Sequence, residues 1–281
     1  MIPTTFDYQR ATSIDDALAK LESARGGKLI AGGHSLVPLM KLRLSEPAVL
    51  IDVARIPDLS GIREVGGAIE IGACTTDREI AQSALLGERC PVVAETAAEI
   101  GDPQVRNRGT LGGSLAHSDP AADYPATMLA IDAEVQIRGP KGARAVKASD
   151  FFQGLFTVDL GPDEMIVGVR FTPVRAAAYA KLHQRASHFA IVGVGAAVEA
   201  SGGTIRQARV GITGAGTHAT RLSAVEQALA GQAATKETIE RAAALATLED
   251  VNADIHASEA YRRAMMQVFT RRAIEGALAR A

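Results

Sequence analysis

Thr110-Leu111-Gly112-Gly113-Ser114-Leu115-Ala116, with the residues that follow it to Asp123, is the stretch around which the rest of this chain is organised. A second glycine pair lies near the N-terminus, in Ala31-Gly32-Gly33-His34-Ser35. Glycine lets the backbone take positive φ and approach a ligand closely, and successive exposed N–H groups form a nest for anions. Two such turns predict two loops that close on one anionic ligand, which we interpret as the diphosphate of a dinucleotide.

The first glycine turn lies between a predicted strand and a predicted helix. Residues 28–31 resemble a short buried strand, Ser35 can cap a helix that carries Leu36 and Leu39, and residues 49–52 resemble the next strand. This order predicts a compact βαβ unit with the turn at its strand-to-helix junction. A helix N-terminus offers unpaired N–H groups and about half a positive charge. Each hydrogen bond to a charged group contributes roughly 1.5–3 kcal/mol, so a phosphate can be held here without a lysine.

The composition is that of a globular protein. Of 281 residues, 47% are hydrophobic and 22% are charged, as is typical of a folded domain. The net charge of −2 argues against a broad basic surface for nucleic acid. The two cysteines, Cys74 and Cys90, have no paired spacing, which argues against an iron–sulfur or zinc centre within this chain. The start lacks the features of a signal peptide, and no apolar run approaches the ~20 residues of a transmembrane helix. We therefore expect a cytoplasmic protein.

The remaining pattern predicts an α+β fold in two domains, residues 1–175 and residues 176–281. In the first domain we expect a helix that begins at the capping box Thr76-Asp77-Arg78-Glu79. We also expect an exposed turn over 119–125, a hairpin over 133–146, and strands over 68–74 and 165–172. In the second domain we expect a three-stranded antiparallel sheet over 179–185, 190–200 and 204–213, followed by helices over 221–230, 236–247 and 259–280.

Two further glycine clusters resemble nucleotide-binding turns but lack the required context. Gly193-Val194-Gly195-Ala196-Ala197 lies inside an apolar strand, and no second βαβ half surrounds Gly214-Ala215-Gly216. Because a dinucleotide fingerprint needs a strand, a turn and a helix in that order, we interpret both clusters as structural. His117 has no nucleophile elbow beside it and is interpreted as a loop histidine.

The two glycine turns, in this order and together with Asp119-Pro120-Ala121-Ala122-Asp123, resemble the flavoprotein subunit of molybdenum hydroxylases. The resemblance covers essentially the whole chain. It includes the medium subunit of aerobic carbon monoxide dehydrogenase and the FAD-binding subunit of xanthine dehydrogenase. It implies an FAD-binding domain of the p-cresol methylhydroxylase type, followed by a C-terminal domain of the carbon monoxide dehydrogenase flavoprotein type.

The resemblance also implies partners and an electron path. A small subunit would carry a [2Fe-2S] centre, and a large subunit would carry the molybdopterin cofactor at which substrate is oxidised. Electrons would pass from the iron–sulfur centre through FAD in this chain to an external acceptor, within a dimer of heterotrimers. The substrate stays open among carbon monoxide, an aldehyde, a purine and another N-heterocycle, because its pocket would lie in another chain.

Residue by residue, the resemblance implies a set of FAD contacts and no catalytic or metal-binding residue. Two groups would hold the cofactor through the glycine turns: Ala31, Gly32, Gly33, His34, Ser35 and Leu36, and Thr110, Gly112, Gly113, Ser114 and Ala116. The remaining contacts are a hydroxyl partner, two apolar residues against the flavin, a basic residue and an aromatic residue: Asp123, Ile100, Ile166, Lys181 and Phe189.

Each of these residues also has a simpler interpretation, and two rival functions remain. His34 could contribute only its backbone, Asp123 could support the helix that Pro125 begins, and Lys181 could be a solvated strand residue. A stand-alone FAD-dependent oxidase or reductase would need a base over the flavin, and the sequence offers no persuasive one. A non-enzymatic nucleotide-binding scaffold would bind nucleotide without a flavin spectrum.

Overall fold

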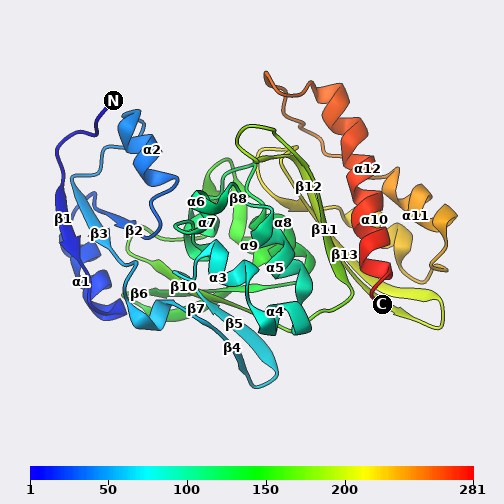
Figure 1. Cartoon of the computed structure of the whole chain (residues 1–281), viewed down its shortest axis with the longest axis horizontal. Helices are drawn as coiled ribbons and strands as arrows, with labels where there is room; N and C mark the ends of the chain where they lie inside the picture. Colours follow the sequence, from blue (N-terminus) through cyan, green and yellow to red (C-terminus); the bar gives the residue numbers. More distant parts are fainter.

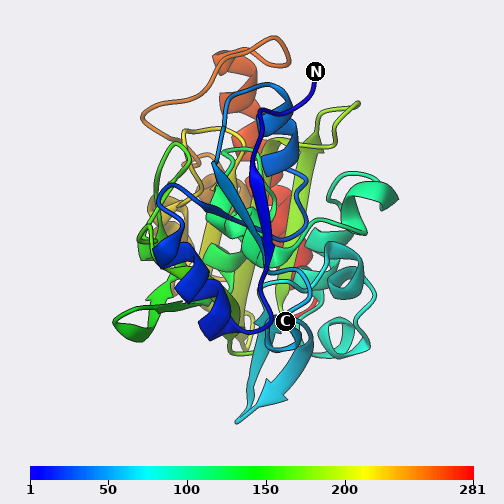
Figure 2. The ribbon, with the colours of Figure 1, turned by 90° about the vertical axis from the view of Figure 1, so that its left-hand side faces the viewer.

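The computed structural model describes residues 1–281, and the parts of the chain follow one another along the long axis of the molecule (Figure 1). A three-stranded sheet lies at one end, a five-stranded sheet with its helices lies in the middle, and a four-stranded sheet with three helices lies at the other end. Figure 2 views the molecule from the N-terminal end, with the first sheet in front of the central part. The architecture is mixed α/β.

The N-terminal part contains the predicted βαβ unit. Its sheet is parallel, with strand order β1-β3-β2, and Ser13 caps its first helix by accepting a hydrogen bond from the Asp16 N–H. The sequence did not predict β1, because this edge strand is polar and largely exposed. The elements are β1 (Asp7–Arg10), α1 (Ile14–Ser23), β2 (Lys28–Ile30), α2 (Leu36–Lys41) and β3 (Val49–Asp52).

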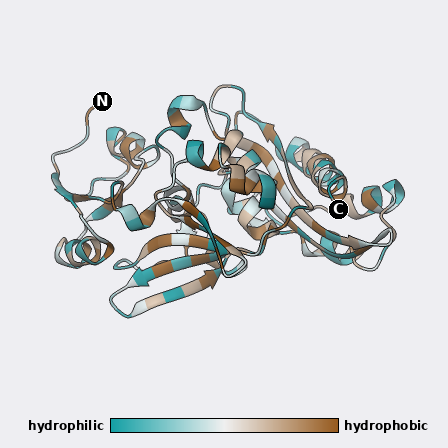
Figure 3. Ribbon diagram, turned by 60° about the horizontal axis from the view of Figure 1, so that its bottom comes forward, coloured by the Kyte–Doolittle hydropathy of each residue, from teal (hydrophilic) through white to brown (hydrophobic).

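The central part is an antiparallel sheet, order β4-β5-β10-β6-β7, with short helices against it. Hydrophobic and hydrophilic bands alternate along its strands in Figure 3, as expected for a sheet with one buried face. The elements are η1 (Pro57–Leu59), β4 (Ile62–Val65), β5 (Ala68–Gly72), α3 (Asp77–Ala81), α4 (Ala84–Arg89), α5 (Pro91–Ala98), α6 (Pro103–Arg106), α7 (Leu111–His117), α8 (Tyr124–Ala130), β6 (Glu134–Gly139), β7 (Gly142–Lys147), α9 (Ala148–Phe151), β8 (Phe152–Gly154), β9 (Thr157–Val158) and β10 (Met165–Phe171).

The C-terminal part holds the three antiparallel strands that the sequence predicts, and the two-residue strand β14 adds a fourth. The expected three-stranded count was therefore one strand short, because two residues are too few to show a period. None of the helices combines the length and the apolar character needed to cross a membrane. The elements are β11 (Ala177–His183), β12 (Ala190–Ser201), β13 (Thr204–Thr213), β14 (Thr220–Arg221), α10 (Ser223–Leu229), α11 (Lys236–Ala243) and α12 (Glu259–Leu278).

Helix α8 joins the central and C-terminal parts. All seven of its residues are buried, and it lies directly on β12 and β13. A Cβ atom placed on Gly195 or Gly211 would lie 2.9 Å or 2.3 Å from the carbonyl oxygen of Ala126. Glycine is therefore required for this close approach, and Gly195 has the structural role that the sequence analysis assigned to its cluster.

Candidate functional site

A cavity of about 400 Å³ opens between the loop before α2, helices α6 and α7, and the loop that joins β11 to β12. Of the sixteen residues that the resemblance singles out, all but Gly112, Ile166 and Lys181 line it. Those that do are Ala31, Gly32, Gly33, His34, Ser35, Leu36, Ile100, Thr110, Gly113, Ser114, Ala116, Asp123 and Phe189.

The two glycine loops touch each other at this cavity. A Cβ atom on Gly32 would lie 1.9 Å from the carbonyl oxygen of Arg108 and 3.2 Å from Cα of Gly109. Both Gly33 and Gly113 line the same space. The predicted convergence of two turns that are distant in sequence is therefore confirmed.

The first glycine loop presents unpaired donors. The backbone N–H groups of Gly32, Gly33, His34 and Ser35 make no hydrogen bond within the protein, and Gly33 holds the turn at φ +74°. Ser35 precedes α2, but its side chain makes no capping hydrogen bond, so the capping role predicted for it was wrong. Because unpaired N–H groups at a loop-to-helix junction favour anionic oxygens, this loop fits a phosphate.

The second glycine loop differs, because its N–H groups are already engaged. Leu111 donates to Thr75, Gly112 donates to Ala73, and Ser114 donates to the carbonyl of Thr110. Thr110 also caps α7, since its hydroxyl accepts from the Gly113 N–H at 3.2 Å. The Thr110 N–H and the Ser114 hydroxyl are left without a partner. The expected nest of successive free N–H groups was therefore wrong for this loop.

Gly112 explains how the second loop is held. It is buried, and a Cβ atom there would lie 2.6 Å from Cβ of Ala73 and 2.9 Å from the Ala73 carbonyl oxygen. The residue lets α7 pack on the backbone just after β5, and its atoms do not reach the cavity. Gly112 positions Gly113 and Ser114, which do line it.

The turn after α7 is buried, although the sequence predicted an exposed turn. Ala122, Asp123, Tyr124 and Pro125 are all buried. The hydroxyl of Thr213 donates to the carbonyls of Pro120 and Ala122 at 2.8 Å each. These bonds come from β13, about ninety residues further along the chain, so no local pattern in the turn could reveal its burial.

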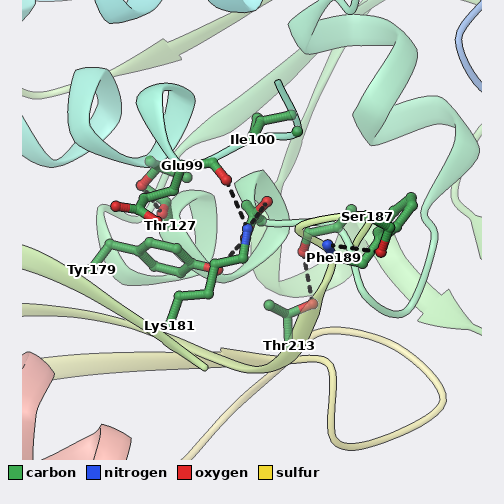
Figure 4. A network of polar contacts seen from close by, with 12 residues as sticks. Glu99, Ile100, Thr127, Tyr179, Lys181, Ser187, Phe189 and Thr213 are labelled. Carbon is green, nitrogen blue, oxygen red and sulfur yellow. Dashed lines mark hydrogen bonds and ion pairs between the residues drawn. The ribbon is translucent and has the colours of Figure 1, made fainter. Parts of the chain in front are cut away.

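Asp123 is the centre of a buried polar network. Figure 4 shows its partners Tyr179 and Lys181, with Glu99 nearby. The Asp123 carboxylate accepts from the Tyr179 hydroxyl at 2.6 Å, and Lys181 Nζ lies 2.9 Å from it. Lys181 also donates to the carbonyl of Glu99 at 2.9 Å. Burial raises the pKa of Asp123 to about 6, against the opposing effect of Lys181. The network ties the start of α8 to β11 and fixes the direction of the carboxylate.

Lys181 therefore acts through Asp123 and does not line the cavity. Its side chain is 2% exposed, so the simpler interpretation as a solvated strand residue was wrong. The neighbouring Tyr179 ring reaches across Gly193, where a Cβ atom would lie 2.2 Å from the tyrosine hydroxyl oxygen. Gly193 thus makes room for the ring, which fits the structural role assigned to its cluster.

The residues expected around the flavin are divided by the fold. Ile100 and Phe189 line the cavity, and Phe189 is 48% exposed in the loop between β11 and β12. Ile166 lies in β10 within the central hydrophobic core and does not reach the cavity. Ser187 and His188 accompany Phe189 along the wall.

The sequence analysis missed Asp77, Gly109 and Lys28, which also line the cavity. Asp77 was interpreted only as part of a capping box, which the structure confirms for Thr76 and Glu79. Its Oδ1 accepts from the Tyr124 hydroxyl at 3.1 Å, and burial raises its pKa to about 7. Two features of the sequence could have indicated Asp77. It is a carboxylate in the first turn of a capped helix, and Gly109 lies just before the second glycine turn.

Comparison with known proteins agrees with this geometry. The family model described as the FAD binding domain in molybdopterin dehydrogenase matches residues 4–174, and that of the CO dehydrogenase flavoprotein C-terminal domain matches residues 177–277. The chain therefore belongs to the FAD-binding flavoprotein family of the molybdopterin dehydrogenases. It is an oxidoreductase chain with an FAD-binding domain.

Similar proteins cover the whole chain. The carbon monoxide dehydrogenase medium chain of Hydrogenophaga pseudoflava is 39% identical over 100% of this chain and 99% of the relative. The solved structure of carbon monoxide dehydrogenase from that organism, which lacks the Mo-pyranopterin moiety of its molybdenum cofactor, matches with a TM-score of 0.97 and 40% identity over 100% of both chains. Quinoline 2-oxidoreductase from Pseudomonas putida 86 matches with a TM-score of 0.93 and 30% identity over 99% of both chains.

Proposed function

We propose that this chain is the FAD-carrying electron-transfer subunit of a molybdenum hydroxylase complex. The observation that carries the proposal is the cavity at which the two glycine loops meet, with four unpaired N–H groups from Gly32 to Ser35 on one wall. The cavity volume of about 400 Å³ falls within the usual range of about 300–1,000 Å³ for ligand sites. The residues present therefore fit a dinucleotide.

The proposed contacts follow from the donors that each wall offers. The first loop would hold the diphosphate through its N–H groups, and the second would add the Thr110 N–H and the Ser114 hydroxyl. Asp123 would accept a hydrogen bond from a cofactor hydroxyl, with Lys181 and Tyr179 fixing its carboxylate. Ile100 and Phe189 would pack against the flavin. Gly112 would position Gly113 and Ser114, and Lys181 would position the Asp123 carboxylate. Ile166 would support the site from the hydrophobic core beneath it.

The bound FAD would supply the redox chemistry, and the protein would supply binding and orientation. The chain has two cysteines, both buried and unpaired, whereas a [2Fe-2S] centre needs four ligands. A small iron–sulfur subunit and a large molybdopterin subunit would therefore complete the complex, as a dimer of heterotrimers with an external electron acceptor. Reduced cysteines fit a cytoplasmic location.

We also propose the finer architecture that the resemblance implies. The FAD-binding domain of the p-cresol methylhydroxylase type would end at residue 175, and the C-terminal domain would begin at residue 176. The two family models support this division, because one ends at residue 174 and the other begins at residue 177. The relatives named above differ in substrate, so the substrate is assigned to the partner subunit and not to this chain.

The experiment must distinguish the electron-transfer subunit from the alternative, a stand-alone flavin oxidase or reductase. The full chain, freed of flavin, is titrated with FAD, and FMN and AMP serve as matched half-molecule controls. We expect flavin absorption bands with FAD, tighter binding of FAD than of either half, and reduction by a chemical reductant. We expect no turnover of aldehydes or N-heterocycles by the chain alone.

Coexpression with its partner chains completes the test. The purified complex should contain FAD, iron and molybdenum. A chain that purifies with FAD alone and oxidises a small substrate would contradict the proposal in favour of the stand-alone enzyme. A well-folded chain that binds AMP but stays colourless with FAD would favour the non-enzymatic scaffold.

A further inference from the structure

A second buried carboxyl group faces the cavity beside Asp123. Asp77, the first residue of α3, is 3% exposed and lines the cavity. Its Oδ1 accepts from the Tyr124 hydroxyl, whereas its Oδ2 makes no hydrogen bond within the protein. That oxygen lies against Gly109, where a Cβ atom would be 2.2 Å from it. Gly109 therefore leaves Oδ2 of Asp77 open toward the space between the two glycine loops.

Only one of the two buried carboxyl groups has a buried cation beside it. Lys181 lies 2.9 Å from Asp123 and neutralises it, whereas Asp77 has no ion pair. The groups that face Asp77 are Tyr124 and Asp123 from α8 and Arg106 from α6. Arg106 is held by the carbonyls of Ile100 and Gly101 at 2.9 Å and 3.1 Å. An ionised Asp77 would therefore stand at the cavity wall without an ion-pair partner, with Arg106 as the cation whose charge acts on it.

A carboxylate without an ion-pair partner conflicts with the ligand that the cavity fits. A diphosphate carries negative charge, and a like charge nearby in a partly buried site is repelled strongly. A protonated carboxyl group removes the repulsion and offers an O–H donor. The geometry thus favours a neutral Asp77 when the cavity is filled.

We propose that Asp77 is a proton-linked cofactor-binding residue, whose neutral form admits FAD and which takes up a proton when FAD binds in alkaline solution. This inference rests on the proposed function, because it concerns the same cavity. It assigns a binding role to a residue that neither the glycine turns nor the family resemblance identified.

The direction of the pH dependence follows from the charges. Burial, the first cause, and the Asp123 charge raise the pKa of Asp77 to about 7 in the empty protein, and a bound diphosphate raises it further. Below about pH 6 Asp77 is protonated in both states, so Asp77 itself adds no pH dependence to the affinity for FAD there. Above about pH 7 binding requires a proton, so the dissociation constant rises with pH by up to about tenfold per unit.

The experiment uses the full chain freed of flavin and FAD itself. Flavin fluorescence gives the dissociation constant from pH 6 to pH 9, and calorimetry in two buffers of different ionisation enthalpy counts the protons taken up. We expect uptake of up to one proton near pH 8 in the natural protein. Asp77→Asn keeps the shape and is permanently neutral, so its affinity at pH 8.5 should exceed that of the natural protein by up to about 30-fold and should vary little with pH.

Controls separate Asp77 from the other titratable groups at the cavity. The other titratable groups are unchanged in Asp77→Asn: Asp123, Asp119, Lys28, His34, His117 and His188. Asp119→Asn is the matched control and should keep the pH dependence of the natural protein. Circular dichroism checks that each variant is folded.

Two results would overturn the proposal. One is an Asp77→Asn protein that keeps the natural pH dependence, and the other is a natural protein that takes up no proton at pH 8. The second result needs no variant, so it is decisive even if Asp77→Asn does not fold. A natural chain that fails to bind FAD at every pH would instead contradict the proposed function.

Discussion

The two glycine loops that meet at the cavity both contain a Gly-Gly pair with a serine shortly after it, but they use their glycines differently. In the first loop, Gly32 lies against the backbone at Arg108 and the N–H groups from Gly32 to Ser35 are free. In the second loop, Gly112 packs on Ala73 and four consecutive N–H groups, from Leu111 to Ser114, are engaged within the protein. A glycine pair can thus leave its N–H groups free for a ligand, or it can allow two backbone segments to pack closely. The residues around the pair determine which of the two occurs.

The cap makes the difference between the loops. Thr110 caps α7 and forms an isolated bridge with Thr76, so the second loop is fixed before any ligand arrives. Ser35 makes no capping bond, so the first loop keeps its donors for a partner outside the chain. We infer that the first loop supplies most of the phosphate binding and the second supplies its support.

The largest effect is expected for Gly32→Ala. The new methyl group cannot fit beside the Arg108 carbonyl, so the first loop must move. Its N–H groups then no longer point toward the bound phosphate. Because each hydrogen bond to a charged group contributes roughly 1.5–3 kcal/mol, we expect FAD affinity to fall on the order of 100-fold. Fluorescence titration measures it. Gly87→Ala, in α4 with open space around its Cβ position, is the matched control and should bind normally.

A smaller effect, on stability more than on binding, is expected for Gly112→Ala. The methyl group would press on Ala73 from a buried position, and overpacking of this kind costs about 1–3 kcal/mol. Urea unfolding with and without FAD measures the free energy of unfolding and the affinity of the folded fraction. A protein of natural stability that no longer binds FAD would show that Gly112 contacts the ligand directly.

The smallest effect is expected for Thr110→Val, which removes the cap of α7. Loss of an N-cap costs about 1 kcal/mol, so the urea midpoint should fall modestly. Ser35→Ala, at the start of α2, removes no capping bond and should change stability by less than about 0.5 kcal/mol. Equal losses in the two variants would mean that Ser35 caps α2 in solution, and the comparison between the loops would fail.

Local patterns in the sequence predicted much of the framework. Alternation and spacing located β5, β10 and the three long strands of the C-terminal sheet, and the capping residue Thr76 marked a helix start correctly. The meeting of the two glycine loops was also predictable. The strands and helix starts depend on residues that are close together in the sequence. The meeting of the two loops was predicted because the Gly-Gly motif occurs in both.

Long-range contacts account for what the sequence did not predict. The burial of Asp123 depends on Thr213, and the burial of Lys181 depends on the ion pair with Asp123. Asp77 at the cavity needs a glycine at position 109, because a Cβ atom there would lie 2.2 Å from its Oδ2. Short elements such as β14 form because they pair with a neighbouring strand, and the pattern of their own residues does not reveal them.

The backbone contact of α8 with Gly195 and Gly211 has a consequence for how the chain can be divided. The two family models meet between residues 174 and 177, but the stretches that they match are not two independent modules. A fragment that stopped there would lose the strands β12 and β13, on which α8 packs, and Lys181, the cation that neutralises Asp123. The flavin-binding half thus depends on the half that follows it for its packing and for the charge partner of Asp123.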